Sequence, residues 1–402
     1  MRIWPFVSRA TATIAFACAL PTPLSAADDS AKLAALEQRI GHFLTSAKWD
    51  DARPRAFATE YALAEMTRRN PVQSWIVDDT GFVKQGRHSV GVQRQYSGTL
   101  GKTGNCQVAV SLTIATTSAH LPIDFALYLP ESWTNDPKRR AEARIPDEVV
   151  FQTKLELALV MIRRAKDNGV PLGVVLVDTA YGNSNDFRME LRQLGMQYAV
   201  AIQGTTKVWR LDRAERIRGE TISAEDLAAE LVKKRKFRRS TWREGTSASL
   251  TARFAAVRVA CAYDNPSIDP SVREALWLVM EWLDGDATPT KYYLASLPAS
   301  MSRRRLVRTI KERYRTERAY EDLKGEMDLD HFEGRRFRGW HHHVSVALAC
   351  FAFVVTERPR VFPAQEEVPV QSEMRWAICP NPPVLPTDSV EGRKIDCAVG
   401  LS

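Results

Sequence analysis

The pattern of apolar and polar positions along this chain of 402 residues changes from helical to strand-like near residue 70. Between residues 32 and 70, apolar side chains such as Leu33, Leu36 and Ile40 recur at helical spacing, which predicts a helical segment. Three runs follow that are either continuously apolar or alternate between apolar and polar residues: 75–80, 88–96 and 105–116. Such runs predict three consecutive strands.

After a polar insert, helical and strand patterns alternate. An amphipathic pattern closed by a glycine and a proline predicts a helix at residues 151–168. The apolar run LGVVLV, which ends at Asp178, predicts a buried strand, and a short helix at 185–194 and a strand at 197–204 follow it. Strands that alternate with helices are typical of a parallel sheet, so the fold class is predicted to be α/β.

Composition and charge narrow the class of protein. The chain is 45% hydrophobic, which is enough for a sizeable core and for two or three domains. Its net charge of +8 favours a polyanionic partner, and the basic residues concentrate in residues 233–243 and 302–315. Each basic run is equally compatible with a solvated helix face. The six cysteines form no Cys-x-x-Cys pair, which argues against structural zinc and a disulfide framework and predicts free thiols.

The first 31 residues resemble a secretory signal, with early arginines, an apolar run and small residues spaced like a cleavage site. No later run of about 20 apolar residues predicts a membrane span. We interpret the start as a decoy that reflects a misplaced start or a fusion. The expected location is the cytoplasm, near the nucleoid, with no membrane partner.

Two strand ends carry candidate chemistry. Asp78 and Asp79 directly follow the apolar run that begins at Trp75, and Asp178 ends the later strand. The sequence Asp-Asp-Thr-Gly is also typical of a turn, so this pair of aspartates alone is compatible with a turn that has no catalytic role. If the two strands are neighbours in one sheet, however, Asp79 and Asp178 lie close together, and a divalent cation between them would offset their repulsion.

A third carboxylate is expected for a two-metal phosphoryl-transfer site. Glu317 is the candidate, because Arg313 and Lys324 fall on the same face of a predicted helix, four residues before it and seven after it. A charged stripe of this kind is also common on solvated helices. Three consecutive histidines, His341 to His343, are not expected to bind metal, since neighbouring residues on a helix point in different directions.

Three segments, in this order, resemble the catalytic core of DDE-type insertion-sequence transposases: WIVDDTGFVKQG, VVLVDTAYGN and RYRTERAYEDLKG. They look most like the branch whose third motif reads Tyr-x2-Arg-x3-Glu-x6-Lys, and the resemblance covers residues 32–358. It implies an RNase H-like catalytic core with a β-rich insertion domain and a helical N-terminal segment. The tyrosine of that motif is replaced here by Ile310, so its contact is absent or supplied by Tyr314.

The resemblance also implies roles for the carboxylates. Asp79, Asp178 and Glu317 correspond to the three catalytic, metal-binding residues, and Asp79 is preferred over Asp78 because it precedes Thr80 as in the family's Asp-Thr pair. The expected cofactor is two Mg²⁺ or Mn²⁺ ions. Arg313 and Lys324 correspond to the family's basic, DNA-binding positions.

About a hundred residues lie between the predicted strand at 197–204 and the predicted helix that carries Glu317, and they include strand-like segments and a basic run. This segment resembles the β-rich insertion of the branch. The following residues are expected to contact DNA phosphates: Lys233, Lys234, Arg235, Lys236, Arg238 and Arg239. Trp242 is either a base-stacking residue or part of the core.

We expect the chain to divide into six parts: a signal-like or misannotated start (1–31), a helical remnant of an N-terminal DNA-binding region (32–70), the first part of the core (71–204), the β-rich insertion (205–302), core helices with the catalytic glutamate (303–358) and an irregular tail (359–402).

The implied function is a transposase that cleaves double-stranded DNA at insertion-sequence ends and joins them to target DNA by two-metal phosphoryl transfer, as a homodimer on DNA. The short N-terminal region and the proline-rich tail leave a second interpretation open: a truncated, inactive remnant that only binds DNA. A third, an exported hydrolase, depends on the signal-like start alone.

Overall fold

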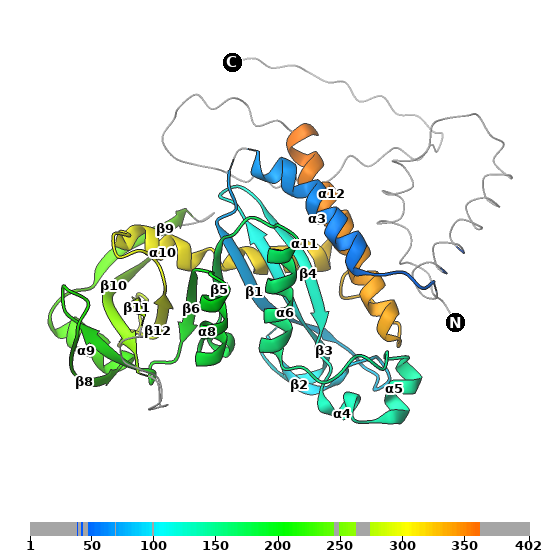
Figure 1. The fold of residues 1–402 in the computed structure, drawn as a ribbon, viewed down its shortest axis with the longest axis horizontal. Helices are drawn as coiled ribbons and strands as arrows, with labels where there is room; N and C mark the ends of the chain where they lie inside the picture. Colours follow the sequence, from blue (N-terminus) through cyan, green and yellow to red (C-terminus); the bar gives the residue numbers. More distant parts are fainter. Residues whose placement is uncertain are drawn as a thin grey trace, which may run out of the picture.

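The structure is a computed structural model in which the described residues are 38, 42, 47–68, 70–98, 100–244, 249–262 and 274–361. They form a mixed α/β fold around a 12-stranded sheet with the order β2-β3-β1-β5-β6-β12-β11-β10-β7-β8, to which β4 adds beside β3 and β9 beside β10 (Figure 1). The expected start at 1–31 and most of the expected tail at 359–402 lie outside the described residues.

The centre of the sheet carries the predicted strands. They are β1 (Ser74–Val83), β2 (Gln93–Ser97), β3 (Lys102–Ala115), β4 (His120–Leu127), β5 (Val174–Val177) and β6 (Tyr198–Ile202). β3 runs antiparallel to β1 and β4, while β5 runs parallel to β1 and to β6. β1 is buried along nearly its whole length, as expected for a strand covered on both faces.

Two strand predictions needed correction. The strand expected at 88–96 is confined to β2, because the chain turns at Gly91, whose φ of 75° glycine adopts readily. β4 was not predicted at all, since Pro122 interrupts its pattern and the β3–β4 register shifts next to it.

The helices before β6 follow local signals. α6 (Lys154–Asp167) begins with a capping box in which Thr153 and Glu156 exchange hydrogen bonds. Gly169, with a φ of 75°, follows its end. The remaining helices of this part are α4 (Glu131–Thr134), α5 (Pro137–Ala143), α7 (Thr179–Gly182) and α8 (Asn185–Gln193). α4 and α5 lie in the polar insert that precedes α6.

Residues between β6 and α10 form a second lobe, coloured green to yellow in Figure 1. Its elements are β7 (Lys207–Leu211), β8 (Ile217–Ser223), α9 (Ala224–Lys233), β9 (Arg238–Glu244), β10 (Ser249–Cys261), β11 (Ala275–Trp282) and β12 (Lys291–Ala295). β12 pairs with β6, so this β-rich segment extends the central sheet.

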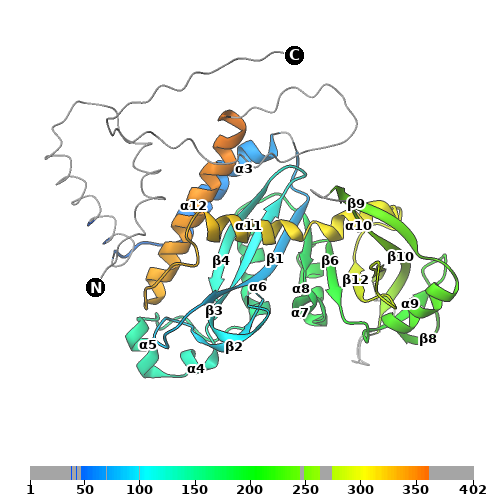
Figure 2. The ribbon, with the colours of Figure 1, turned by 180° about the vertical axis from the view of Figure 1, so that it is seen from behind.

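The described part of the chain also contains α3 (Ala52–Thr67), α10 (Arg303–Lys311), α11 (Tyr314–Gly325) and α12 (Phe337–Val361). α10 and α11 follow one another from the second lobe across the central sheet, and α3 and α12 pack side by side at its far end (Figure 2). Residues 337–358 of α12 are long and apolar enough to cross a membrane, contrary to expectation, but 61% of the qualifying window is buried in the protein, as in a core helix.

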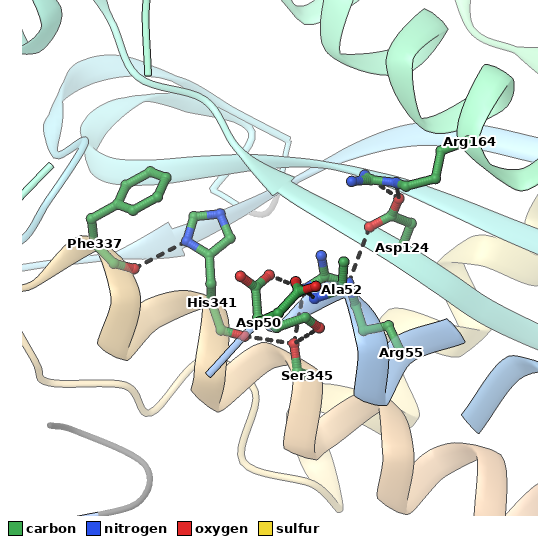
Figure 3. Close-up of polar contacts among 9 residues, drawn as sticks. Asp50, Ala52, Arg55, Asp124, Arg164, Phe337, His341 and Ser345 are labelled. Carbon is green, nitrogen blue, oxygen red and sulfur yellow. Dashed lines mark hydrogen bonds and ion pairs between the residues drawn. The ribbon is translucent and has the colours of Figure 1, made fainter. Parts of the chain in front are cut away.

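A buried ionic network holds α3 and α12 against the sheet (Figure 3). The guanidinium of Arg55 donates to Asp51 and Ser345 and lies 3.3 Å from Oδ1 of Asp124 in β4. Arg164 of α6 also donates to Asp124, with an Nε–Oδ2 distance of 3.0 Å. Four elements are thereby joined through one buried aspartate.

Candidate active site

Asp78 and Asp178 lie at the same level of two neighbouring parallel strands. In the β1–β5 pair Ile76 is opposite Leu176, and two further residues along each strand bring the chain to Asp78 and Asp178. Cross-strand partners share a face of a sheet, so both carboxylates face the same way. On β3, Asp78 is opposite Ser111, whose hydroxyl hydrogen-bonds that of Tyr320 in α11 at 2.6 Å. This face is therefore the one that α11 covers.

Arg313 joins this strand end to Glu317. It lies at the break between α10 and α11, and its two terminal nitrogens contact Oδ2 of Asp78 at 2.6 Å and Oε1 of Glu317 at 3.1 Å. The side chain of Glu317 is 57% exposed, whereas that of Asp78 is 12% exposed. Asp78 therefore lies at the buried bottom of the site and Glu317 at its exposed edge, with the guanidinium of Arg313 between them.

The surroundings of Asp78 shift the pKa of its carboxyl group. Burial and the negative charge of Asp178 raise its pKa to about 7, although the guanidinium of Arg313 acts in the opposite direction. The main cause is the loss of hydration on burial, which disfavours the charged form of the carboxyl group even beside Arg313. An added cation would favour its ionised form.

Asp79 does not join this cluster, contrary to the sequence-based expectation. Adjacent residues of a strand point to opposite faces, and the carboxylate of Asp79 accepts hydrogen bonds from Lys154 of α6 and from the hydroxyl of Tyr181 in α7. The preference for Asp79 rested on the residue that follows it, which does not indicate the face of the sheet on which the side chain lies. An alternation of apolar and polar residues along β1 would have indicated that face, but β1 is buried on both faces and shows no such alternation.

Asp178 caps α7. Its Oδ1 accepts hydrogen bonds from the backbone N–H groups of Ala180 and Tyr181, at 2.9 and 3.3 Å. The second oxygen is left for other partners. The expected place of Asp178 at a strand end, beside the first aspartate pair, is what the structure has.

Lys324 reaches the same strand further along. Its ammonium donates to the backbone carbonyl of Gly81 at 2.9 Å and lies 5.3 Å from the ring centre of Phe82. Burial lowers the pKa of Lys324, while Asp330 counteracts this. The structure thus uses Lys324 to attach α11 to β1.

The expected DNA-contacting run begins at the end of α9. Lys233, Lys234, Arg235 and Lys236 are exposed there, but Lys234 lies 3.4 Å from Glu230. On β9, Arg239 pairs with Asp284, and Arg238 donates to two nearby backbone carbonyls.

Trp242 packs edge-on against Phe254, with ring centres 5.7 Å apart, and Lys311 lies 4.5 Å from its ring centre. Of the two interpretations of Trp242, the structure has the packed one.

The second basic run of the sequence, residues 302–315, also forms a surface, although only Arg313 of this run was expected to contact DNA. α10 buries Leu306, Val307 and Ile310 and exposes a row of arginines on its outer side: Arg304, Arg305 and Arg308. Arg243 of the neighbouring β9 lies 4.2 Å from the ring centre of Tyr314, which directly follows Arg313. Cationic side chains therefore lead from α10 and β9 to the carboxylates.

Side chains capable of holding a metal are oxygen donors at this site: Asp78, Asp178 and Glu317. Among the described residues no group of three or more His, Cys, Asp or Glu side chains is already gathered around a metal position. His341, His342 and His343 diverge, as expected, toward the carbonyl of Phe337, the ring of Trp49 and the carbonyl of Asp328. A set of oxygen donors suits Mg²⁺ or Mn²⁺ better than zinc.

Two family profiles match the sequence. The profile described as DDE superfamily endonuclease matches residues 22–249, and the profile described as transposase DDE domain matches residues 152–353. The chain therefore belongs to the DDE superfamily of endonucleases and transposases.

Within this superfamily the chain is similar to the probable transposase for insertion sequence element IS701 of Microchaete diplosiphon. The two are 33% identical over 186 residues, which are 46% of this chain and 46% of that relative. The chain thus spans less than half the length of this curated relative. The narrower branch expected from the Tyr-Arg-Glu-Lys motif stays a prediction.

Solved structures give weaker likenesses. The piggyBac transposase synaptic complex with hairpin DNA is 12% identical, with a TM-score of 0.36 over 72% of this chain and 48% of that chain. The NurA nuclease from Sulfolobus solfataricus is also 12% identical, with a TM-score of 0.22 over 83% of this chain and 97% of that chain. Neither TM-score is high enough to establish a shared fold.

Proposed function

We propose that the chain is a metal-dependent transposase that cleaves DNA at insertion-sequence ends and joins them to target DNA. The observation that carries this proposal is the convergence of Asp78, Asp178 and Glu317 around the guanidinium of Arg313. Asp78 replaces Asp79 as the first catalytic aspartate, because only Asp78 shares a face with Glu317.

The central strands support an RNase H-like core. In the order β4-β3-β1-β5-β6, three antiparallel strands are followed by two that run parallel to β1. This is the plan that the resemblance implied. It brings the ends of β1 and β5 together, which is where ligands bind in open α/β sheets.

Asp78, Asp178 and Glu317 would hold two Mg²⁺ or Mn²⁺ ions. When bound, such ions activate water and stabilise the attacking and leaving oxygens of a phosphoryl transfer. The chain's own contribution is to fix the carboxylates: Ser111 and Tyr320 line the floor beside Asp78, and the cap of α7 orients Asp178. Arg313 offers a phosphate its planar guanidinium, which suits bidentate contact.

Duplex DNA is the proposed substrate, and the exposed arginines of α10 together with Arg243 are the proposed path by which its backbone reaches the site. Two transposon ends require two active sites, so we propose a homodimer on DNA. Neither the cleavage of the insertion-sequence end nor its joining to target DNA needs a covalent protein–DNA intermediate.

The test is nicking of a supercoiled plasmid that carries the terminal repeats flanking this reading frame, with Mg²⁺ present. We expect nicking by the native chain and loss of at least about 100-fold in Asp78→Asn and Glu317→Gln, because each removes a charged oxygen ligand. DNA retardation by both variants should be retained.

Glu321→Gln is the matched control, since Glu321 lies one turn after Glu317 on α11 and pairs with the exposed Arg318. It should nick at the native rate. Retention of DNA without nicking by the native chain would contradict the proposal and favour the DNA-binding remnant. Full activity of Asp78→Asn would exclude Asp78 as a ligand.

A further inference from the structure

The carboxylate that the proposed chemistry leaves aside, Asp79, has two partners on its own side of the sheet. Tyr181 donates its hydroxyl hydrogen bond to Oδ1, and the ammonium of Lys154 pairs with Oδ2. Tyr181 and Lys154 come from α7 and the start of α6, 102 and 75 residues away along the chain. A single aspartate thus joins both helices to β1.

Tyr181 is held at both ends. Its backbone N–H donates to Oδ1 of Asp178, and its hydroxyl donates to Asp79. The ring between these two contacts is 1% exposed and packs against Phe187, with ring centres 5.9 Å apart. A buried aromatic ring has few rotamers, so the distance between its two ends is nearly fixed.

The other side of α7 has no room to move. A Cβ on Gly182 would lie 2.0 Å from the carbonyl oxygen of Ala201 in β6. α7 is therefore confined between β6 and the Tyr181–Asp79 contact, and Asp178 is its first capping residue. Any shift of Tyr181 would be transmitted to Asp178.

Lys154 balances the charge of Asp79. The two side chains are partly exposed, at 31% and 26%. With this pair neutral in sum, the negative charge beside the strand end belongs mainly to Asp78 and Asp178. The Asp-Asp sequence of β1 thereby supplies one carboxylate to each face for different purposes.

We propose that Asp79 is a positioning residue that places Asp178 through Tyr181, with Lys154 as its counter-charge, and that it is not itself a metal ligand. The inference rests on the proposed function, in which Asp178 binds a divalent cation. Groups that orient metal ligands in other proteins contribute 10- to 100-fold in metal affinity.

The experiment measures Mn²⁺ binding to the full chain without DNA, from the electron paramagnetic resonance signal of free Mn²⁺, alongside nicking as a function of Mg²⁺. Tyr181→Phe keeps all charges and removes only the hydroxyl contact. We expect its Mn²⁺ affinity to fall about 10-fold or more, with nicking recovering at saturating Mg²⁺. Tyr292→Phe is the control, because it also removes a buried tyrosine hydrogen bond, to the Pro289 carbonyl, but in the second lobe.

Charge rescue separates positioning from ligation. Asp79→Asn should weaken Mn²⁺ binding, since Lys154 then carries an uncompensated positive charge. The double variant Asp79→Asn/Lys154→Met restores the net charge and keeps an oxygen that accepts from Tyr181. It should bind Mn²⁺ within about 3-fold of the native chain, which is a difference of less than 1 kcal/mol.

A double variant that binds and nicks as poorly as Asp78→Asn would show that Asp79 is a ligand and overturn the proposal. Native affinity in Tyr181→Phe would also overturn it, while the proposed function would stand. Absence of Mn²⁺ binding by the native chain would instead remove the proposed function together with this inference. Thermal unfolding without metal checks that each variant is folded.

Discussion

Lys311 and Glu281 form an ion pair across the junction of α10 and β11, with 2.5 Å between Nζ and Oε1. Glu281 is fully buried, and its other oxygen accepts a hydrogen bond from Tyr293 at 3.1 Å. Because Lys311 lies two residues before Arg313, this pair fixes the end of α10 where the site begins. The second lobe and the proposed catalytic helix are thereby joined through one buried charge.

Lys311→Met should therefore destabilise the protein by about 3–5 kcal/mol, since it leaves the buried Glu281 carboxylate without its counter-charge. The double variant Glu281→Gln/Lys311→Met removes both charges, keeps an acceptor for Tyr293 and should recover most of that loss. Urea unfolding measures both. Lys234→Met, which breaks the exposed pair with Glu230, is the control and should cost less than about 1 kcal/mol. Equal losses in the two single variants would contradict the prediction.

Acid should destabilise the fold through His341. Burial lowers the pKa of His341 to about 4, although Asp51 and Asp124 act in the opposite direction and Arg55 adds to the lowering. Its folded pKa lies below its unfolded value of 6.5, so the unfolded chain takes up the proton first. The stability is fully present above pH 6.5 and is lost as the pH falls from there toward 4.

Between pH 7 and pH 5 the loss from His341 alone should be roughly 2 kcal/mol. His341→Gln keeps an N–H for the Phe337 carbonyl and lacks the titrating ring, so it should show a smaller loss over the same interval. The free energy of unfolding in urea at the two pH values measures the difference. Identical pH dependence in the variant and the native chain would exclude His341 as the source.

Strong local signals made part of the fold predictable. β1 and β5 are continuous apolar runs, and α6 starts at a capping box and stops at a glycine, so their positions follow from short segments of sequence. The edge of the sheet was harder, because Pro122 breaks the pattern of β4. Elements with a regular pattern over a few consecutive residues were therefore predicted correctly, and elements with an irregular pattern were not.

The candidate site was predictable in its members but not in its geometry. Asp178, Glu317 and Arg313 were identified by position in motifs, yet the choice between Asp78 and Asp79 depends on which face α11 covers. That is a tertiary property, and β1 is buried on both sides. The contacts of Asp79 with Lys154 and Tyr181 span 75 and 102 residues, so no local pattern indicates them.

DNA affinity should depend on α10 more than on the run first expected to bind it. Arg308→Ala removes an exposed cation beside the proposed path, so it should weaken duplex binding and reduce the slope of log K against log salt by about 1. Arg239→Ala should change that slope less, because Arg239 is already paired with Asp284. Fluorescence anisotropy with a labelled duplex at several salt concentrations gives both slopes, and the reverse order would favour the β9 surface.

Substitution of Gly182 should lower metal-dependent nicking although this residue does not touch the substrate. In Gly182→Ala the new methyl group would lie 2.0 Å from the Ala201 carbonyl oxygen and 3.0 Å from Cβ of Val200, so α7 must move away from β6. Overpacking of this kind costs about 1–3 kcal/mol. Because Asp178 caps α7, the same movement should lower metal-dependent nicking by about 10-fold or more while the chain stays folded.

Gly98→Ala is the control, since a Cβ there meets nothing within 4 Å, and it should change stability by no more than about 0.5 kcal/mol. Native nicking by Gly182→Ala would show that α7 can shift without displacing Asp178, and the confinement argued for this helix would then be wrong.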